Sequence, residues 1–139
     1  MKISSYIATS LDGFIARADH NLDWLENATT NENNNENKNE DYGFKDFLST
    51  VDTLIMGRKT YEFIISANQW FYGNIKVIVL SSILTELSNL LPSTAEIRNI
   101  SANALCDELK QSNSKHIYID GGQTIQSFIQ NNLIDEITI

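Results

Sequence analysis

Four consecutive residues in the middle of the chain, Gly57, Arg58, Lys59 and Thr60, have the chemistry of an anion site. They stand between a short apolar run and a segment whose apolar residues have helical spacing, which predicts a strand, a glycine and then a helix. Cations at a helix start oppose the helix dipole, and a bound anion would reverse that penalty. Phosphate suits such a helix start, although an ordinary strand-to-helix turn with solvated charges would have the same sequence.

Two more polar or glycine-rich segments follow predicted strands. Ser81 and Ser82 follow the β-branched run 75–80, and the run 115–120 leads into Gly121, Gly122, Gln123 and Thr124. The glycines would let a ligand approach the backbone closely. Because parallel sheets bind ligands beyond the carboxyl ends of their strands, we expect the three segments to share one ligand with several phosphates. The usual dinucleotide and Walker glycine spacings are both absent.

The elements that must position these segments alternate along the chain. Strands are expected at 2–9, 53–56, 75–80, 96–100, 115–120 and 135–139. Helices are expected at 44–51, 58–65, 101–109 and 123–129, from their apolar spacing. A short extended piece is also expected after the turn at residues 12–13. The alternation predicts an α/β fold of three layers, with a mostly parallel central sheet and helices on both faces.

Composition limits the class of protein. The 139 residues suffice for one domain, 1–139, and the net charge of −8 argues against nucleic-acid binding. The single cysteine, Cys106, excludes an internal disulfide, and the cysteine and two histidines make no metal spacing. No run is long enough to span a membrane, so a cytoplasmic location is expected by default. The asparagine-rich residues 27–41 predict a mobile surface loop.

The motifs together resemble a known family. Residues 54–62 (Leu-Ile-Met-Gly-Arg-Lys-Thr-Tyr-Glu) look like the cofactor motif of the dihydrofolate reductase fold. The segments 79–82 (Val-Leu-Ser-Ser) and 119–123 (Ile-Asp-Gly-Gly-Gln) follow in the right order. Segments 10–16 (Ser-Leu-Asp-Gly-Phe-Ile-Ala) and 133–136 (Leu-Ile-Asp-Glu) resemble one branch, the bacterial riboflavin-biosynthesis reductases of the RibD C-terminal domain family. Members of that family continue past the last segment, so the chain is expected to lack terminal strands.

The resemblance implies NADPH as the cofactor and gives each segment a role. Arg58, Ser81 and Ser82 would hold the 2′-phosphate, and a guanidinium offers a bidentate fork for it. The pyrophosphate would contact the turn 121–124 together with Gly57, Lys59 and Thr60. The nicotinamide would face the strand end at Ala8 and the loop that contains Gly13 and Ile15.

Two residues are candidates for the acid that assists proton delivery. Dihydrofolate reductases carry an acidic residue early in the helix before the cofactor motif, and Asp41 lies at a compatible distance. Asp41 also ends the low-complexity run, which favours a solvated loop acid. Asp12 is the other candidate, and it could equally serve only to set the turn with Gly13.

These features favour an NADPH-dependent reductase of a small pyrimidine- or pterin-like heterocycle. The closest activity by resemblance is 5-amino-6-(5-phosphoribosylamino)uracil reductase, and dihydrofolate reductase is the alternative. A non-catalytic NADP-binding module is an alternative of another class. Flavodoxin-like FMN binding is disfavoured, because Asp12 stands where a phosphate loop would be needed. The family usually pairs, and the apolar alternation of Ile137 and Ile139 also leads us to expect a homodimer.

Overall fold

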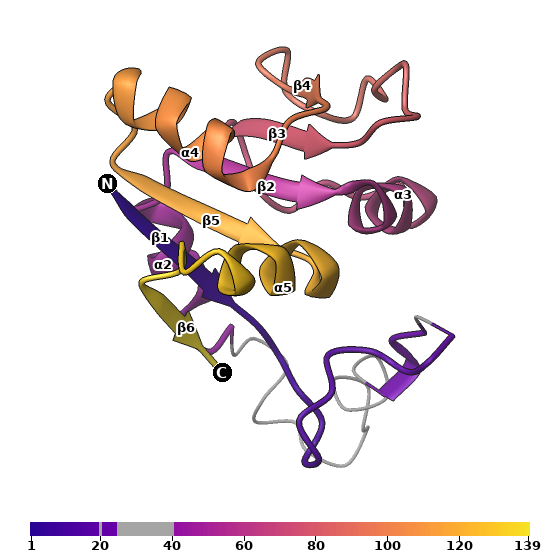
Figure 1. The fold of residues 1–139 in the computed structure, drawn as a ribbon. Helices are drawn as coiled ribbons and strands as arrows, with labels where there is room; N and C mark the ends of the chain where they lie inside the picture. Colours follow the sequence, from indigo (N-terminus) through magenta and orange to yellow (C-terminus); the bar gives the residue numbers. More distant parts are fainter. Residues whose placement is uncertain (20, 25–40) are drawn as a thin grey trace.

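The computed structural model describes residues 1–19, 21–24 and 41–139, and its strands form one parallel sheet. The order across the sheet is β4-β3-β2-β5-β1-β6, and every pairing is parallel (Figure 1). The strands are β1 (Lys2–Tyr6), β2 (Thr53–Gly57), β3 (Lys76–Leu80), β4 (Glu96–Arg98), β5 (His116–Asp120) and β6 (Glu136–Thr138). The predicted mostly parallel α/β fold is confirmed.

Helices cover both faces of the sheet, because side chains of successive strand residues point to opposite faces. On one face, α4 (Ala102–Gln111) and α5 (Gly122–Gln130) bury a core with alternate residues of β2 and β5, such as Ile55 and Ile117. On the other face, α2 (Phe44–Ser49) and α3 (Arg58–Ser66) pack against the intervening residues, such as Met56 and Tyr118. The three predicted layers are confirmed.

The connections diverge between the adjacent strands β2 and β5. The chain leaves β2 through α3 toward β3 on one side, and it leaves β5 through α5 toward β6 on the other (Figure 1). The two helices pack on opposite faces of the sheet. Such a change of direction between neighbouring strands is the place where open parallel sheets bind ligands, beyond the carboxyl ends of the strands. The fold therefore directs attention to the ends of β2 and β5.

Some expected elements differ in detail. The extended piece expected after residues 12–13 does not form, because the Ser10 hydroxyl and carbonyl close residues 10–14 into a turn. Helix α2 ends two residues before the buried Val51, which packs in the core beyond the helix end. Residues 27–40 of the predicted asparagine-rich loop lie outside the described residues. No helix among the described residues is both long and apolar enough to cross a membrane.

A buried histidine connects β1, β5 and the end of α2. The His116 Nε2 atom lies 2.9 Å from Ser4 Oγ, and its Nδ1 atom lies 2.9 Å from Thr50 Oγ1. The Thr50 hydroxyl donates to the Phe47 carbonyl at 2.7 Å, so it accepts from Nδ1–H, which leaves Nε2 to accept from Ser4. Both nitrogens of the neutral ring are thus satisfied. Burial, reinforced by the charge of nearby Lys2, lowers the pKa of His116 below its ordinary value of 6.5.

We expect the free energy of unfolding to fall as the pH drops below about 6.5. Since the folded pKa is depressed, this contribution is complete above the unfolded pKa and is lost as the pH falls through the folded one. His116→Ala should flatten this dependence. It should also cost about 1–3 kcal/mol at neutral pH, because the buried Ser4 hydroxyl loses its acceptor. Urea unfolding of both proteins between about pH 5 and pH 7 measures this. An equally steep dependence in the variant would assign it to other groups.

Candidate active site at the carboxyl ends of the strands

Three of the predicted segments leave the sheet at one level. Gly57 at the end of β2 pairs in register with Leu80 at the end of β3, and Met56 pairs with Asp120 at the end of β5. Arg58, Ser81 and Gly121 therefore follow neighbouring strands at matching heights. The structure brings together the segments that the sequence analysis assigned to one ligand.

The first turns of α3 and α5 contact each other across β2 and β5. A Cβ atom added to Gly57 would lie 2.7 Å from Thr124 Oγ1, and one added to Gly121 would overlap Thr60 Oγ1. The Thr124 side chain of α5 thus packs against Gly57, and the Thr60 side chain of α3 packs against Gly121, where a larger residue would leave no space. Gly121 also has a φ of +91°, which side-chain-bearing residues rarely adopt. This reciprocal contact brings the two helix N-termini close together.

Both of these helices have a glycine as the N-cap residue, so neither N-cap supplies a side-chain hydrogen bond to the helix start. Helix α3 begins after Gly57 and α5 after Gly121, and neither glycine can supply a side-chain acceptor. By contrast, the Ser101 hydroxyl accepts from Ala104 N at the start of α4, as the sequence predicted. Gly57 and Gly121 offer no such acceptor to the first turns of α3 and α5, and the positive ends of both helix dipoles meet here. The arrangement suits an anionic ligand.

Hydrogen bonds hold the Arg58 side chain and the turn after β3 in place. Arg58 Nη1 donates to both carboxylate oxygens of Glu62, at 2.6 and 2.8 Å, one helical turn along α3. The Ser81 hydroxyl accepts from Leu84 N at 2.9 Å and so shapes the turn after β3. Lys59, Ser82 and Gln123 are exposed. All the predicted phosphate-binding side chains except the buried Thr124 therefore reach solvent at this edge.

The predicted nicotinamide loop reaches the start of α5. A Cβ atom on Gly122 would lie 3.7 Å from Ile15 Cδ1, so this loop residue borders the glycine turn. Gly13 has a φ of +85°, and the exposed Ala8 follows β1. Asp12 is also exposed, and its carboxylate accepts from the Ser10 hydroxyl at 2.5 Å. This hydrogen bond places Asp12 in the turn that Ser10 closes.

Asp41 has a structural role at the start of α2. Its two carboxylate oxygens accept from Gly43 N at 3.2 Å and Lys45 N at 3.0 Å. These backbone hydrogen bonds, led by the one from Lys45, lower the pKa of Asp41 below its ordinary range. A carboxylate that holds its charge in this way is a poor proton donor near neutral pH.

A third acid, Asp120, which was not among the predicted site residues, lies at the level where the segments meet. One of its oxygens accepts from Gly121 N at 2.8 Å, and the other accepts from the Tyr72 hydroxyl at 2.7 Å. The residue is only half-buried, but its carboxyl is enclosed by these groups and by Tyr118. Desolvation dominates and raises the pKa of Asp120, although the donors oppose it. Its place directly before the glycine pair was the available sequence signal.

Aromatic rings surround this acid on the α2 face of the sheet. We call them the aromatic wall, and their neighbouring centroids lie 5.0–6.4 Å apart. Its members are Tyr6, Phe44, Phe47, Trp70, Tyr72 and Tyr118. The Tyr118 hydroxyl donates to the Tyr6 carbonyl at 3.2 Å, and Tyr6 in turn donates to the Tyr42 carbonyl. Tyr118 is buried in the core of this face, and the other five rings, which are partly buried, pack against it.

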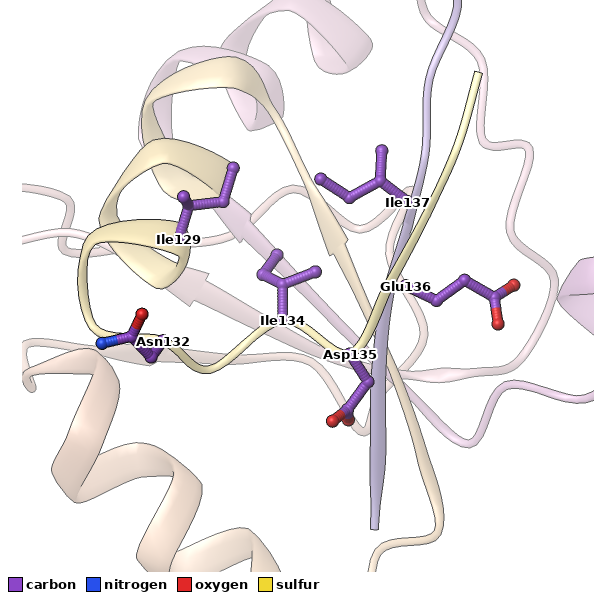
Figure 2. Close-up of a pocket in the computed structure, with 6 residues that line it drawn as sticks. All are labelled: Ile129, Asn132, Ile134, Asp135, Glu136 and Ile137. Atoms are coloured by element: carbon purple, nitrogen blue, oxygen red, sulfur yellow. The ribbon is translucent and has the colours of Figure 1, made fainter.

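Two surface hollows are found among the described residues. One runs between the end of α5 and β6, where Ile129, Ile134 and Ile137 face a common space (Figure 2). The other is lined by residues between 10 and 18 and by Trp24, and Asp12 is part of its lining. No three His, Cys, Asp or Glu side chains of the described residues gather in a way that could hold a metal ion. Ile137 and Ile139 are exposed, as expected, and the homodimer inferred from them stays a prediction.

Comparison with known proteins identifies the family. The family model described as RibD C-terminal domain matches residues 1–139. The uncharacterized protein YwjB of Bacillus subtilis (strain 168) is 35% identical over 136 residues, which cover 96% of this chain and 72% of that protein. The uncharacterized protein YyaP of the same organism is 29% identical over 143 residues and covers 94% and 68%.

Solved structures share the fold. A protein assigned to riboflavin biosynthesis from Shewanella sp. PV-4 superimposes with a TM-score of 0.81 and 34% identity, covering all of this chain and 78% of its own. A diaminohydroxyphosphoribosylaminopyrimidine deaminase/5-amino-6-(5-phosphoribosylamino)uracil reductase from Thermotoga maritima gives a TM-score of 0.57 at 14% identity, with 94% and 42% covered. The latter supports the fold alone. The chain therefore belongs to the RibD C-terminal domain family, and it is a reductase-like domain related to the reductase of riboflavin biosynthesis.

Proposed function

We propose that the protein is an NADPH-dependent reductase of a pyrimidine- or pterin-like heterocycle, most like 5-amino-6-(5-phosphoribosylamino)uracil reductase. One observation supports this most strongly. The glycine-capped starts of α3 and α5 meet where the connections of β2 and β5 diverge, and Asp120 stands one residue before the second start. The site thus combines a place for phosphates with an acid that can hold a proton.

The residues present fit a dinucleotide phosphate. The first-turn N–H groups of α3 and α5 would bind the pyrophosphate, and Gly57 and Gly121 leave the backbone accessible. Arg58 and Ser81, on neighbouring strand ends, would hold the 2′-phosphate. Bound NADPH would supply the hydride, which carries an electron pair to an unsaturated carbon of the substrate. The loop around Ile15 would cover the nicotinamide.

The remaining requirement of such a reduction is a proton. When a hydride adds to carbon in a C=N or C=O bond, the heteroatom must take a proton to complete the product. Desolvation raises the pKa of Asp120 and so shifts this carboxyl toward the neutral form, which could donate that proton, and water could then restore it. Asp12 and Asp41 are both held by hydrogen bonds within their own segments. We therefore assign proton delivery to Asp120.

Dihydrofolate reduction is the second candidate. It would use Asp41 near the start of α2 to bind a pterin ring. The carboxylate oxygens of Asp41 already accept from the backbone of Gly43 and Lys45, which favours the first candidate. A module that binds NADP without catalysing a reaction would need no proton donor, so it would leave the Asp120 carboxyl without a function. Turnover against a panel of pterins and aminopyrimidines separates these readings.

We expect Arg58→Ala to weaken NADPH binding by roughly 10–100-fold and to leave NADH binding nearly unchanged. The reason is that only NADPH has a 2′-phosphate. The exposed Arg58–Glu62 pair contributes only about 0.3–0.5 kcal/mol, whereas a hydrogen bond to a charged phosphate contributes about 1.5–3 kcal/mol. The Arg58 guanidinium should therefore leave Glu62 and bind the phosphate. Titration calorimetry with both cofactors measures the effect, and equal losses for the two would remove Arg58 from this role.

Glu62→Gln provides the matched control. This variant removes the carboxylate that competes for Arg58 and leaves the guanidinium in place. NADPH should then bind a few-fold more tightly, in the opposite direction to Arg58→Ala. Weaker NADPH binding in Glu62→Gln would show instead that Glu62 holds Arg58 in the orientation that binding needs.

A further inference from the structure

Tyr72 reaches the end of β5 from outside the sheet. It lies in the connection between α3 and β3, and its hydroxyl donates to Asp120 Oδ2 at 2.7 Å. The ring is largely buried and lies 5.0 Å from Trp70, whose Nε1 donates to the Gly73 carbonyl at 2.7 Å. Gly73, with a φ of +61°, allows this tight turn. The phenol is therefore held by its own segment as well as by the carboxyl.

The hydrogen bonds at Asp120 decide where its proton can reside. Oδ1 accepts from Gly121 N, a backbone donor that cannot become an acceptor. The proton of the neutral acid must therefore sit on Oδ2, beside the Tyr72 hydroxyl. A phenol can donate to the ionised carboxylate and can accept from the neutral acid. Tyr72 can thus serve both protonation states of the same oxygen.

Tyr72 is the phenol whose hydroxyl donates to the carboxyl, whereas the hydroxyl of the second phenol, Tyr118, donates to a backbone carbonyl. The groups that act on the carboxyl are Tyr72 from the α3–β3 connection, Tyr118 from β5 itself and the N–H of Gly121 at the start of α5. From β2, the residue in register is the apolar Met56. The Tyr118 hydroxyl donates to the Tyr6 carbonyl at 3.2 Å, so its single hydrogen is shared.

We propose that Tyr72 is a positioning residue: its phenol fixes the plane of the Asp120 carboxyl and keeps the transferable proton on Oδ2. The inference rests on the proposed function, in which that proton goes to the substrate heteroatom as the hydride adds to the neighbouring carbon. Asp120 is left as a carboxylate, to which the phenol again donates. Tyr72 contributes no proton of its own to the product.

Tyr72→Phe tests this, with Tyr118→Phe as the matched control. Both changes keep the ring and remove one hydroxyl. The titration of the Asp120 carboxyl is followed by carbon-13 NMR on the intact protein and assigned with Asp120→Asn. Because the phenol stabilises the charged carboxylate, its loss should move the midpoint to higher pH by about one pH unit in Tyr72→Phe. The shift in Tyr118→Phe should be smaller.

Turnover of a reducible substrate by NADPH gives a second readout. The rate should fall as the pH rises through the Asp120 midpoint, and in Tyr72→Phe that fall should move to higher pH together with the NMR midpoint. An unchanged midpoint, or an equal shift in Tyr118→Phe, would overturn the role of Tyr72 even if the protein turns over. Absence of turnover with every substrate, alongside the expected NMR shift, would count against the proposed function and leave Tyr72 as the residue that sets the carboxyl.

Discussion

Gly121→Ala is expected to lower the free energy of unfolding by about 2–6 kcal/mol, the sum of two separate costs. The first is backbone strain, because a residue with a side chain must adopt the φ of +91°. The second is overpacking, because the added Cβ atom would overlap Thr60 Oγ1. Since domains of this size are stable by only about 5–15 kcal/mol, urea unfolding should detect the loss easily.

Gly122→Ala is the matched control for this prediction. Its φ is not in the left-handed region, and the new Cβ atom would meet only Ile15 Cδ1, at an ordinary 3.7 Å. We expect a change within about 0.5 kcal/mol. Combining Gly121→Ala with Thr60→Ala should recover the overpacking cost but not the backbone cost. Equal stability of the two single variants would contradict the contact between the helix starts.

Asp120→Asn is expected to reduce turnover by about 10²–10⁴-fold, the usual contribution of a general acid. Asparagine keeps the shape of the side chain, and its oxygen can still accept a hydrogen bond from Gly121 N or from the Tyr72 hydroxyl. It has no proton to give, so NADPH should bind with unchanged affinity while the chemical step fails. Steady-state oxidation of NADPH, beside titration calorimetry, separates the two effects.

The free energy of unfolding of Asp120→Asn provides an independent test of this prediction. The folded pKa of Asp120 is raised, so folding favours the neutral acid, and stability falls as the pH rises from the ordinary value near 3.8 through the folded pKa. Asp120→Asn removes that fall and should unfold at higher denaturant concentration near neutral pH. An inactive but more stable variant is typical of a functional residue. Asp12→Asn and Asp41→Asn should keep turnover. If either variant lost as much turnover as Asp120→Asn, proton delivery would have to be assigned to that residue instead.

The fold was predictable because its signals are local. Apolar periodicity and punctuating glycines predicted β2, α3, β5 and α5 nearly to their ends, and Ser101 was recognised as the cap of α4. The same signals placed Arg58 and Ser81 directly after strand ends, and the register of β2 and β3 shows that these two strands are neighbours.

The contacts that define the acid were not predictable in this way. Asp120 and Tyr72 are separated by two strands and a helix in the chain, and no periodicity links them. The reciprocal packing of Gly57 with Thr124 depends on the order of the strands, which the sequence pattern leaves open. Asp12 shows the reverse case, since its hydrogen bond from Ser10, two residues earlier, is a local contact within the turn that the sequence predicts.

We expect a phosphate-bearing cofactor to bind where the starts of α3 and α5 meet. Backbone amide NMR shifts recorded as NADPH is titrated into the full chain test it most directly. The largest changes should occur at the N–H groups of residues 57–60 and 121–124, with smaller changes around Ile15. Changes confined to the hollow beside β6, around Ile129 and Ile137, or no change at saturating NADPH, would contradict it.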